Sequence, residues 1–135
     1  MDRHTLKTFE KSLMRCSGSP AFIDRFYAIF LASSTKVQEK FAQTDFTRQK
    51  NALRASLHLM LQVAGDVKNG PDHYLKDLAE VHSRRQRNIG ADLYDLWLKS
   101  LLATVKEMDP QCSLEIERAW DKVMRIGIRY LLARY

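Results

Sequence analysis

Apolar side chains recur every three or four positions along almost all of this 135-residue chain. This spacing places them on one side of an α-helix, which has 3.6 residues per turn. No stretch alternates apolar and polar residues as a half-buried strand does. The pattern therefore predicts an all-α chain, and the length predicts a single domain spanning residues 1–135.

Proline, glycine and capping side chains divide this pattern into six main helices and a short one. Ser19 followed by Pro20 predicts the cap and first turn of the second helix. Asp45 and Ser113 are the expected caps of the long central helix and of the last helix. The predicted helical segments are approximately 6–16, 20–32, 37–41, 45–66, 74–82, 94–108 and 113–131.

Composition limits the classes of function. The net charge is +6, but the basic residues are spread among 16 acidic ones, so we expect no nucleic-acid partner. No apolar run is long enough to span a membrane, and the first residues lack a signal-peptide core, which predicts a cytoplasmic protein with no membrane partner. Cys16 and Cys112 have no metal-ligand spacing and are expected to be free thiols.

One histidine stands on an apolar helix face. Leu75, Leu78 and His82 recur at helical spacing, so the imidazole of His82 points off that face. A histidine in this position is more often a hydrogen-bonded core residue than a ligand. The basic cluster directly after it, Arg84-Arg85-Gln86-Arg87, is either a solvated loop or an anion site beside whatever His82 binds.

Two further polar groups interrupt apolar stripes. Tyr27 lies among Ile23, Phe26 and Phe30, and Gln49 lies between two apolar positions of the central helix. A buried hydroxyl or amide without a partner costs roughly 1–3 kcal/mol, so each needs a partner or a cavity. Either these are separately satisfied core residues, or Tyr27, Gln49 and His82 share a cavity that holds a ligand.

The order and spacing of several segments resemble a bacterial globin over nearly the whole chain. The resemblance is closest to the globin domains of flavohaemoglobins, single-domain haemoglobins and globin-coupled sensors. The segments that carry it are 26–30, 37–41, 46–53, 78–82 and 93–105, with Ala119-Trp120 later.

The resemblance implies a globin fold around haem b and a role for each matching residue. His82 would be the proximal ligand of the haem iron, with Leu78 one turn before it. The second ring nitrogen of His82 would donate to a backbone carbonyl or an acidic side chain. Tyr27 and Gln49 would face the sixth coordination position of the iron, where Leu53 would crowd the pocket.

Other matching positions would form the walls of the haem pocket. Phe41 would pack against the porphyrin. Tyr94 and Trp97 would close the proximal and inner walls, although both also fit plain core positions. The candidates to pair with the haem propionates are Lys50, Arg84, Arg85 and Arg87.

Some features depart from the flavohaemoglobin pattern. Flavohaemoglobins append a reductase domain, which we do not expect after Tyr135, and the last helix lacks the glutamate that supports the proximal histidine in that family. The distal helix begins about two residues sooner after Phe41, and the loop after His82 is about two residues longer. The assignment of Gln49 as the distal residue therefore depends on where the gap of about two residues after Phe41 is placed in the comparison with flavohaemoglobins.

The resemblance implies a protein that binds dioxygen and also nitric oxide or carbon monoxide, as a monomer or a homodimer. One alternative is a nitric oxide dioxygenase supplied with electrons by an external reductase. Another is a gas or redox sensor that acts through a partner protein. The last is a helical interaction module without haem.

Overall fold

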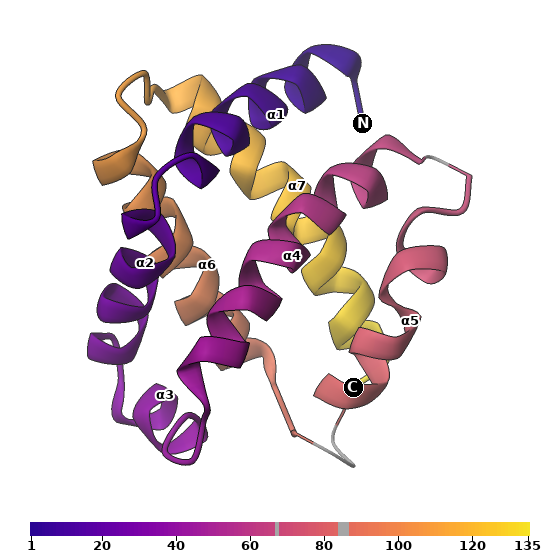
Figure 1. The fold of residues 1–135 in the computed structure, drawn as a ribbon. Helices are drawn as coiled ribbons and strands as arrows, with labels where there is room; N and C mark the ends of the chain where they lie inside the picture. The colour runs from indigo at the N-terminus through magenta and orange to yellow at the C-terminus, as the bar shows by residue number, and fades with distance from the viewer. Residues whose placement is uncertain (67, 84–86) are drawn as a thin grey trace.

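Seven α-helices make up most of this computed structural model, which describes residues 1–66, 68–83 and 87–135 (Figure 1). The described residues contain no strand, so the all-α prediction is confirmed. The helices are α1 (Arg3–Ser17), α2 (Ala21–Ala32), α3 (Thr35–Lys40), α4 (Phe46–Gly65), α5 (Gly70–His82), α6 (Ala91–Met108) and α7 (Leu114–Ala133).

Two of the three predicted helix caps are confirmed. The Asp45 side chain accepts from the backbone amides of Thr47 and Arg48 at the start of α4. The Ser113 hydroxyl accepts from the first turn of α7. The prediction for Ser19 is wrong, because α2 begins at Ala21 without any side-chain cap. Instead, the Ser19 backbone carbonyl accepts from the Phe22 amide at 3.2 Å, so a backbone bond opens this helix.

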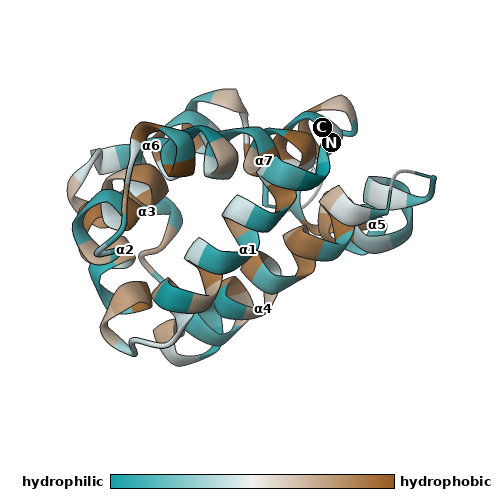
Figure 2. Cartoon of the chain, turned by 90° about the horizontal axis from the view of Figure 1, so that it is seen from above, coloured by the Kyte–Doolittle hydropathy of each residue, from teal (hydrophilic) through white to brown (hydrophobic). Residues whose placement is uncertain are grey.

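The helices pack as a bundle in which α4 and α7 cross near the centre. The α2 helix packs against α6, whereas α4 contacts α1, α5 and α7. In the view from above, apolar stretches of α2 and α4 lie on the inner side of the bundle (Figure 2). The largest fully buried side chains are Trp120, Phe9, Phe22 and Phe26.

A buried ionic cluster ties the first helix to the connection between the last two. Arg15 donates from Nε and Nη2 to the two carboxylate oxygens of Asp109, at 2.8 and 2.9 Å. Ser12 donates to the same carboxylate at 2.6 Å and accepts from the Trp120 indole at 2.8 Å. These hydrogen bonds satisfy polar groups that would otherwise be costly inside the core.

The structure also bears on two compositional predictions. Cys16 is buried and Cys112 half-buried, and both are free thiols, as predicted. Among the described helices, none is both long and apolar enough to cross a membrane.

Candidate functional site

His82 is the last residue of α5, and its ring is held by a side chain of α6. Its Nδ1 atom lies 2.9 Å from the hydroxyl oxygen of Tyr94, and the two ring centroids are 6.2 Å apart. The sequence predicted a backbone carbonyl or an acidic side chain as this partner. The structure instead supplies a phenol, and Tyr94 itself is buried.

The imidazole of His82 is kept uncharged. Burial lowers the pKa of His82 to about 4, and the positive charge of Arg87 acts in the same direction. Within the described part of the chain, Nε2 has no hydrogen-bond partner. A neutral imidazole with one nitrogen fixed and the other available is the form in which histidine binds a metal.

Tyr27 occupies the inner face of α2 and is only 4% exposed. Its hydroxyl donates to the backbone carbonyl of Gln49 over a long 3.5 Å contact. Burial raises the pKa of Tyr27 to about 12, so the phenol keeps its proton at neutral pH. The hydrogen bond that the Tyr27 hydroxyl donates to the Gln49 carbonyl is therefore weak.

The Gln49 side chain is half-buried in the first turn of α4. Its backbone carbonyl meets Tyr27, as described above, and no hydrogen bond to its side-chain amide occurs within the residues the structure describes. The structure therefore brings Tyr27 and Gln49 together through the backbone of Gln49, whereas among the described residues no hydrogen bond or ring contact joins this pair to His82.

An aromatic cluster surrounds the ring of Tyr27. Phe41 follows α3, and its ring centroid lies 6.2 Å from that of Tyr27 and 6.1 Å from that of Phe46. Phe30 contacts Phe41 at 5.7 Å. Phe41 is half-buried, so part of its ring stays open to a ligand or to solvent.

The other predicted pocket residues lie on the helices that connect these two groups. Leu53, 6% exposed, is one turn beyond Gln49 on α4, and Leu78 is half-buried one turn before His82 on α5. Trp97 contacts Phe26 of α2 with its centroid 6.1 Å away. Tyr94 contacts His82, and Trp97, one turn further along α6, contacts Phe26 next to Tyr27. The α6 helix therefore reaches both the residues near His82 and the residues near Tyr27.

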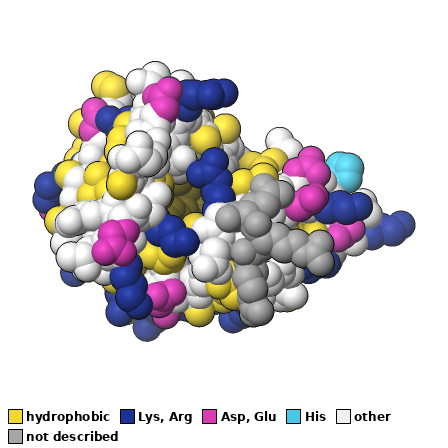
Figure 3. Space-filling view, turned by 90° about the horizontal axis from the view of Figure 1, so that it is seen from below, with side chains coloured by type: hydrophobic (Ala, Val, Ile, Leu, Met, Phe, Trp, Pro, Cys, Tyr) yellow, Lys and Arg dark blue, Asp and Glu magenta, His cyan; other side chains and the backbone are white. Residues whose placement is uncertain are grey.

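A cavity of about 440 Å³ opens at the same end of the molecule. Its lining comes from α3, from Asn88, Gly90 and Tyr135, and from Asp92 and Leu93 at the start of α6; His82, Tyr27 and Gln49 do not line it. The view from below shows a hollow with an apolar floor and with Lys and Arg side chains beside it (Figure 3). Lys36 and Lys40 belong to this cavity wall.

The structure gives a partner to one of the basic residues that the sequence offered for the haem propionates. Lys50 forms an ion pair with Asp24 at 2.9 Å, so its charge is already paired. Lys40 donates to the backbone carbonyl of Arg87 at 2.9 Å, which links α3 to the segment after His82. Arg84 and Arg85 lie outside the described residues. Lys36, which the sequence analysis did not single out, forms an ion pair with Asp92 at 3.0 Å, so its charge is paired like that of Lys50.

Comparison with known proteins agrees with this architecture. The globin family profile matches residues 24–128. A crystal structure of protein PA3967 from Pseudomonas aeruginosa PAO1, described as structurally highly homologous to a human hemoglobin, is 39% identical with a TM-score of 0.90. The alignment covers 97% of this chain and 98% of that one. No curated protein matches. The helical fold is a globin fold, and the chain belongs to the globin family.

Globins typically carry haem, and the residues of this site fit that group. One protein imidazole suffices as the axial ligand of haem iron, and His82 is neutral with Nε2 free of hydrogen bonds within the described residues. Apolar and aromatic side chains, including Phe41, Leu53 and Leu78, offer the surface that a flat apolar cofactor needs.

Proposed function

We propose that this chain binds haem b through Nε2 of His82 and uses it to bind dioxygen and other diatomic gases. The observation that carries the proposal is the state of His82, which is neutral, fixed at Nδ1 by Tyr94 and free of hydrogen bonds at Nε2 within the described residues. Haem, when bound, supplies an iron that coordinates diatomic gases.

On the proximal side, the residues orient the ligand nitrogen. For Nε2 to present a lone pair, the proton of the imidazole must sit on Nδ1, from which it donates to the Tyr94 oxygen. Leu78 and the buried ring of Tyr94 limit access of water to the imidazole. The same burial prevents protonation of His82 at neutral pH.

On the distal side, Tyr27 and Gln49 provide the hydrogen-bond donors. The Tyr27 phenol keeps its proton, and its 3.5 Å contact to the Gln49 carbonyl is weak enough to exchange for a better acceptor. The Gln49 amide is a second donor. A gas that carries partial negative charge gains about 1 kcal/mol or more from each bond, whereas neutral carbon monoxide gains less. This predicts tight binding of dioxygen.

Haem titration followed by absorption spectroscopy tests this proposal. Purified protein is titrated with hemin, and spectra are recorded in the ferric, ferrous and oxygenated states. We expect a Soret band at one haem per chain, lost in His82→Ala and restored in part by added imidazole. His58→Ala, which alters an exposed histidine of α4, is the matched control. A wild-type chain without a Soret band would refute the proposal.

Two other functions stay predictions of the sequence. Nitric oxide dioxygenation needs an external reductase, and turnover of nitric oxide in its presence would establish it. A sensor would change its partner or its oligomeric state when a gas binds. A cytoplasmic location likewise stays a prediction.

A further inference from the structure

Basic side chains gather on the outer face of α7. Arg118, Lys122, Arg125 and Arg129 are all exposed, and they follow one another at intervals of four, three and four residues. This spacing keeps them within about 60° around the helix axis and spreads them over about 16 Å along it. Charges that are scattered in the sequence therefore form one continuous row, which we call the basic stripe of α7.

The basic stripe lies opposite the buried face of α7, which includes Trp120 and Val123. An exposed apolar side chain extends the stripe at one end. Leu114 is 60% exposed and precedes Arg118 by four residues, so both lie on the same helix face. The outer face of α7 therefore combines a row of positive charges with one apolar contact point.

Most of the positive charge in the basic stripe is unpaired. Arg125 forms an ion pair at 2.9 Å with Asp121, which lies one turn before it on α7. Arg118, Lys122 and Arg129 form no ion pair with any residue that the structure describes. Exposed charges without a partner attract oppositely charged groups of other molecules. The stripe is therefore suited to an anionic partner.

Carboxylates border the basic stripe on both sides. On the side of α1, Glu115 bonds to His4. On the side of α6, Asp95 lies close enough to Arg125 to raise its pKa, in addition to the larger effect of Asp121. A broad anionic surface, such as a lipid bilayer or a DNA duplex, would bring these carboxylates against its own negative charge. The positive strip between them fits a narrow anionic partner.

We propose that the basic stripe and Leu114 form a docking surface for an acidic helix of another protein. Carboxylates at the same spacing along one face of that helix would meet the four cations, and an apolar residue would cover Leu114. A second copy of this chain does not fit, because in a two-fold dimer the stripe would face its own positive charges. The surface involves no residue of the haem site, so the proposal is independent of the proposed function.

Titration of the ¹⁵N-labelled full chain with two synthetic peptides tests the docking surface. The first peptide is a helix with one leucine and four glutamates on a single face. The second contains the same residues in an order that distributes the glutamates around the helix. We expect the first peptide to bind about five-fold more tightly or better, and to shift the amide resonances of residues 114–129. Raising the salt concentration from about 50 to about 300 mM should weaken its binding about five-fold or more.

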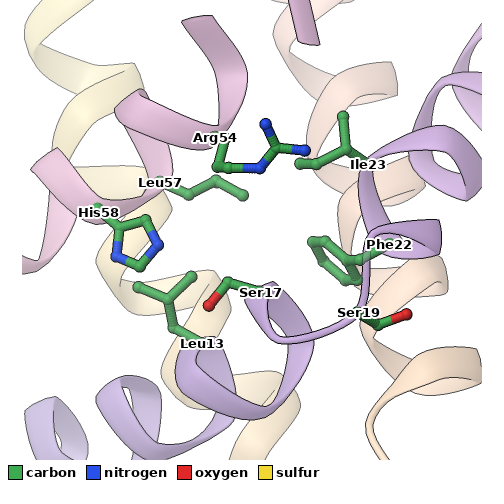
Figure 4. A pocket seen from close by; sticks show the side chains of 8 residues that line it. All are labelled: Leu13, Ser17, Ser19, Phe22, Ile23, Arg54, Leu57 and His58. Carbon is green, nitrogen blue, oxygen red and sulfur yellow. The ribbon is translucent and has the colours of Figure 1, made fainter. Parts of the chain in front are cut away.

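Two charge reversals separate the basic stripe from general attraction by net charge. Arg118→Glu changes an unpaired cation of the stripe. Arg54→Glu makes the same change in net charge on α4, where Arg54 is exposed at the rim of a small cavity between α1, α2 and α4 (Figure 4). We expect the affinity for the first peptide to fall about five-fold or more in Arg118→Glu and less than about two-fold in Arg54→Glu. Leu114→Ala should weaken it about two-fold or more. Far-ultraviolet circular dichroism verifies the helical content of each variant.

Several results would overturn the docking surface. Equal affinity for the two peptides would do so, as would an equal loss in Arg118→Glu and Arg54→Glu. Phosphatidylcholine vesicles with about one third phosphatidylglycerol and a DNA duplex are titrated in parallel. If either bound more tightly than the first peptide, and Arg118→Glu weakened that binding, the stripe would belong to a membrane or a nucleic-acid site instead. A wild-type dimer that Arg118→Glu dissociates would show that the stripe contacts a second copy.

Discussion

The Nδ1 atom of His82 and the hydroxyl oxygen of Tyr94 lie 2.9 Å apart, joining the end of α5 to the first turns of α6. Two proton arrangements fit this distance. Tyr94 donates to Nδ1 when the ring proton is on Nε2, and accepts from Nδ1 when the proton is there. Only the second arrangement leaves Nε2 free to bind a metal, so metal binding at His82 requires Tyr94 to accept the hydrogen bond from Nδ1–H.

Tyr94→Phe should alter the tautomer of His82. Loss of a hydrogen bond worth about 1 kcal/mol changes the tautomer ratio about five-fold in favour of the Nε2–H form. Long-range ¹H–¹⁵N spectra of the haem-free protein measure this ratio from the two ring nitrogens. Tyr74→Phe, on α5, serves as the control. An unchanged ratio in Tyr94→Phe would show that Tyr94 does not orient the imidazole.

Tyr27→Phe should accelerate dissociation of dioxygen from the haem-loaded protein. The variant keeps the ring contacts with Phe41 and Phe46 but loses the donor, so a loss of about 1 kcal/mol or more gives a five-fold or larger increase. Stopped-flow displacement of dioxygen by carbon monoxide measures the rate. The carbon monoxide dissociation rate should change less. Equal dioxygen rates in the two proteins would remove Tyr27 from the distal site.

Gln49→Leu tests the second distal donor separately. The side-chain amide is lost while the backbone carbonyl that contacts Tyr27 remains. We expect dioxygen dissociation to increase about two-fold to five-fold. Gln38→Leu, at an exposed residue of α3, is the control. No change in Gln49→Leu would shift the distal role to another residue of the first turns of α4.

Asp109→Asn should destabilise the protein at neutral pH by about 2–4 kcal/mol, because it removes the carboxylate that partners Arg15. Burial by itself raises the pKa of Asp109, but hydrogen bonds from Arg15, Ser12 and the Gln111 amide outweigh it and lower the pKa to about 2. The stabilisation is therefore complete above the ordinary value of 3.8 and is lost as pH falls towards 2.

Urea unfolding between pH 5 and pH 2 measures this dependence. The wild type should lose stability steeply below about pH 4, and Asp109→Asn should show a shallower slope over the same interval. Asp77→Asn, at an exposed position of α5, should follow the wild type. If the free energy of unfolding of Asp109→Asn and of the wild type changed in parallel with pH, the proposed role of the Asp109 carboxylate would be contradicted.

Gly127 allows α7 to approach α4 closely. A Cβ atom at this position would lie 3.0 Å from both Sδ and Cε of Met60. Gly127→Ala should stay within about 1 kcal/mol of the wild type, because the flexible end of Met60 can shift and alanine favours helix. Gly127→Leu should cost about 1–3 kcal/mol by overpacking, and Met60→Ala should recover part of it. Chemical denaturation of the wild type, Gly127→Leu, Met60→Ala and the double variant measures the four free energies of unfolding that this cycle needs. Gly127→Ala is measured beside them.

The sequence predicted the helices well where each forms a single buried stripe. The last predicted helix, 113–131, corresponds to α7, in which Ile116, Trp120 and Leu131 are buried. In α6, Trp97, which fits a core position in the sequence, is half-buried, whereas Leu98 and Thr104 are buried.

The residues of the proposed site could be singled out from the sequence, but their contacts could not be predicted from it. His82, Tyr27 and Gln49 were identified because polar groups on apolar helix faces are costly. The Tyr94 partner of His82 was not, because it depends on how α5 and α6 approach each other in space. The same holds for Lys40, whose bond to the Arg87 carbonyl joins segments 47 residues apart.

The connection between α6 and α7, which begins at Asp109, lies in the upper part of the molecule, whereas α3 and the end of α5 lie at the bottom (Figure 1). The buried polar cluster around Asp109 is thus remote from the residues proposed to bind the gas. Substitutions around α3 and the end of α5 leave this cluster intact. Such a division lets a lineage explore new ligand preferences at one end while the scaffold is secured at the other.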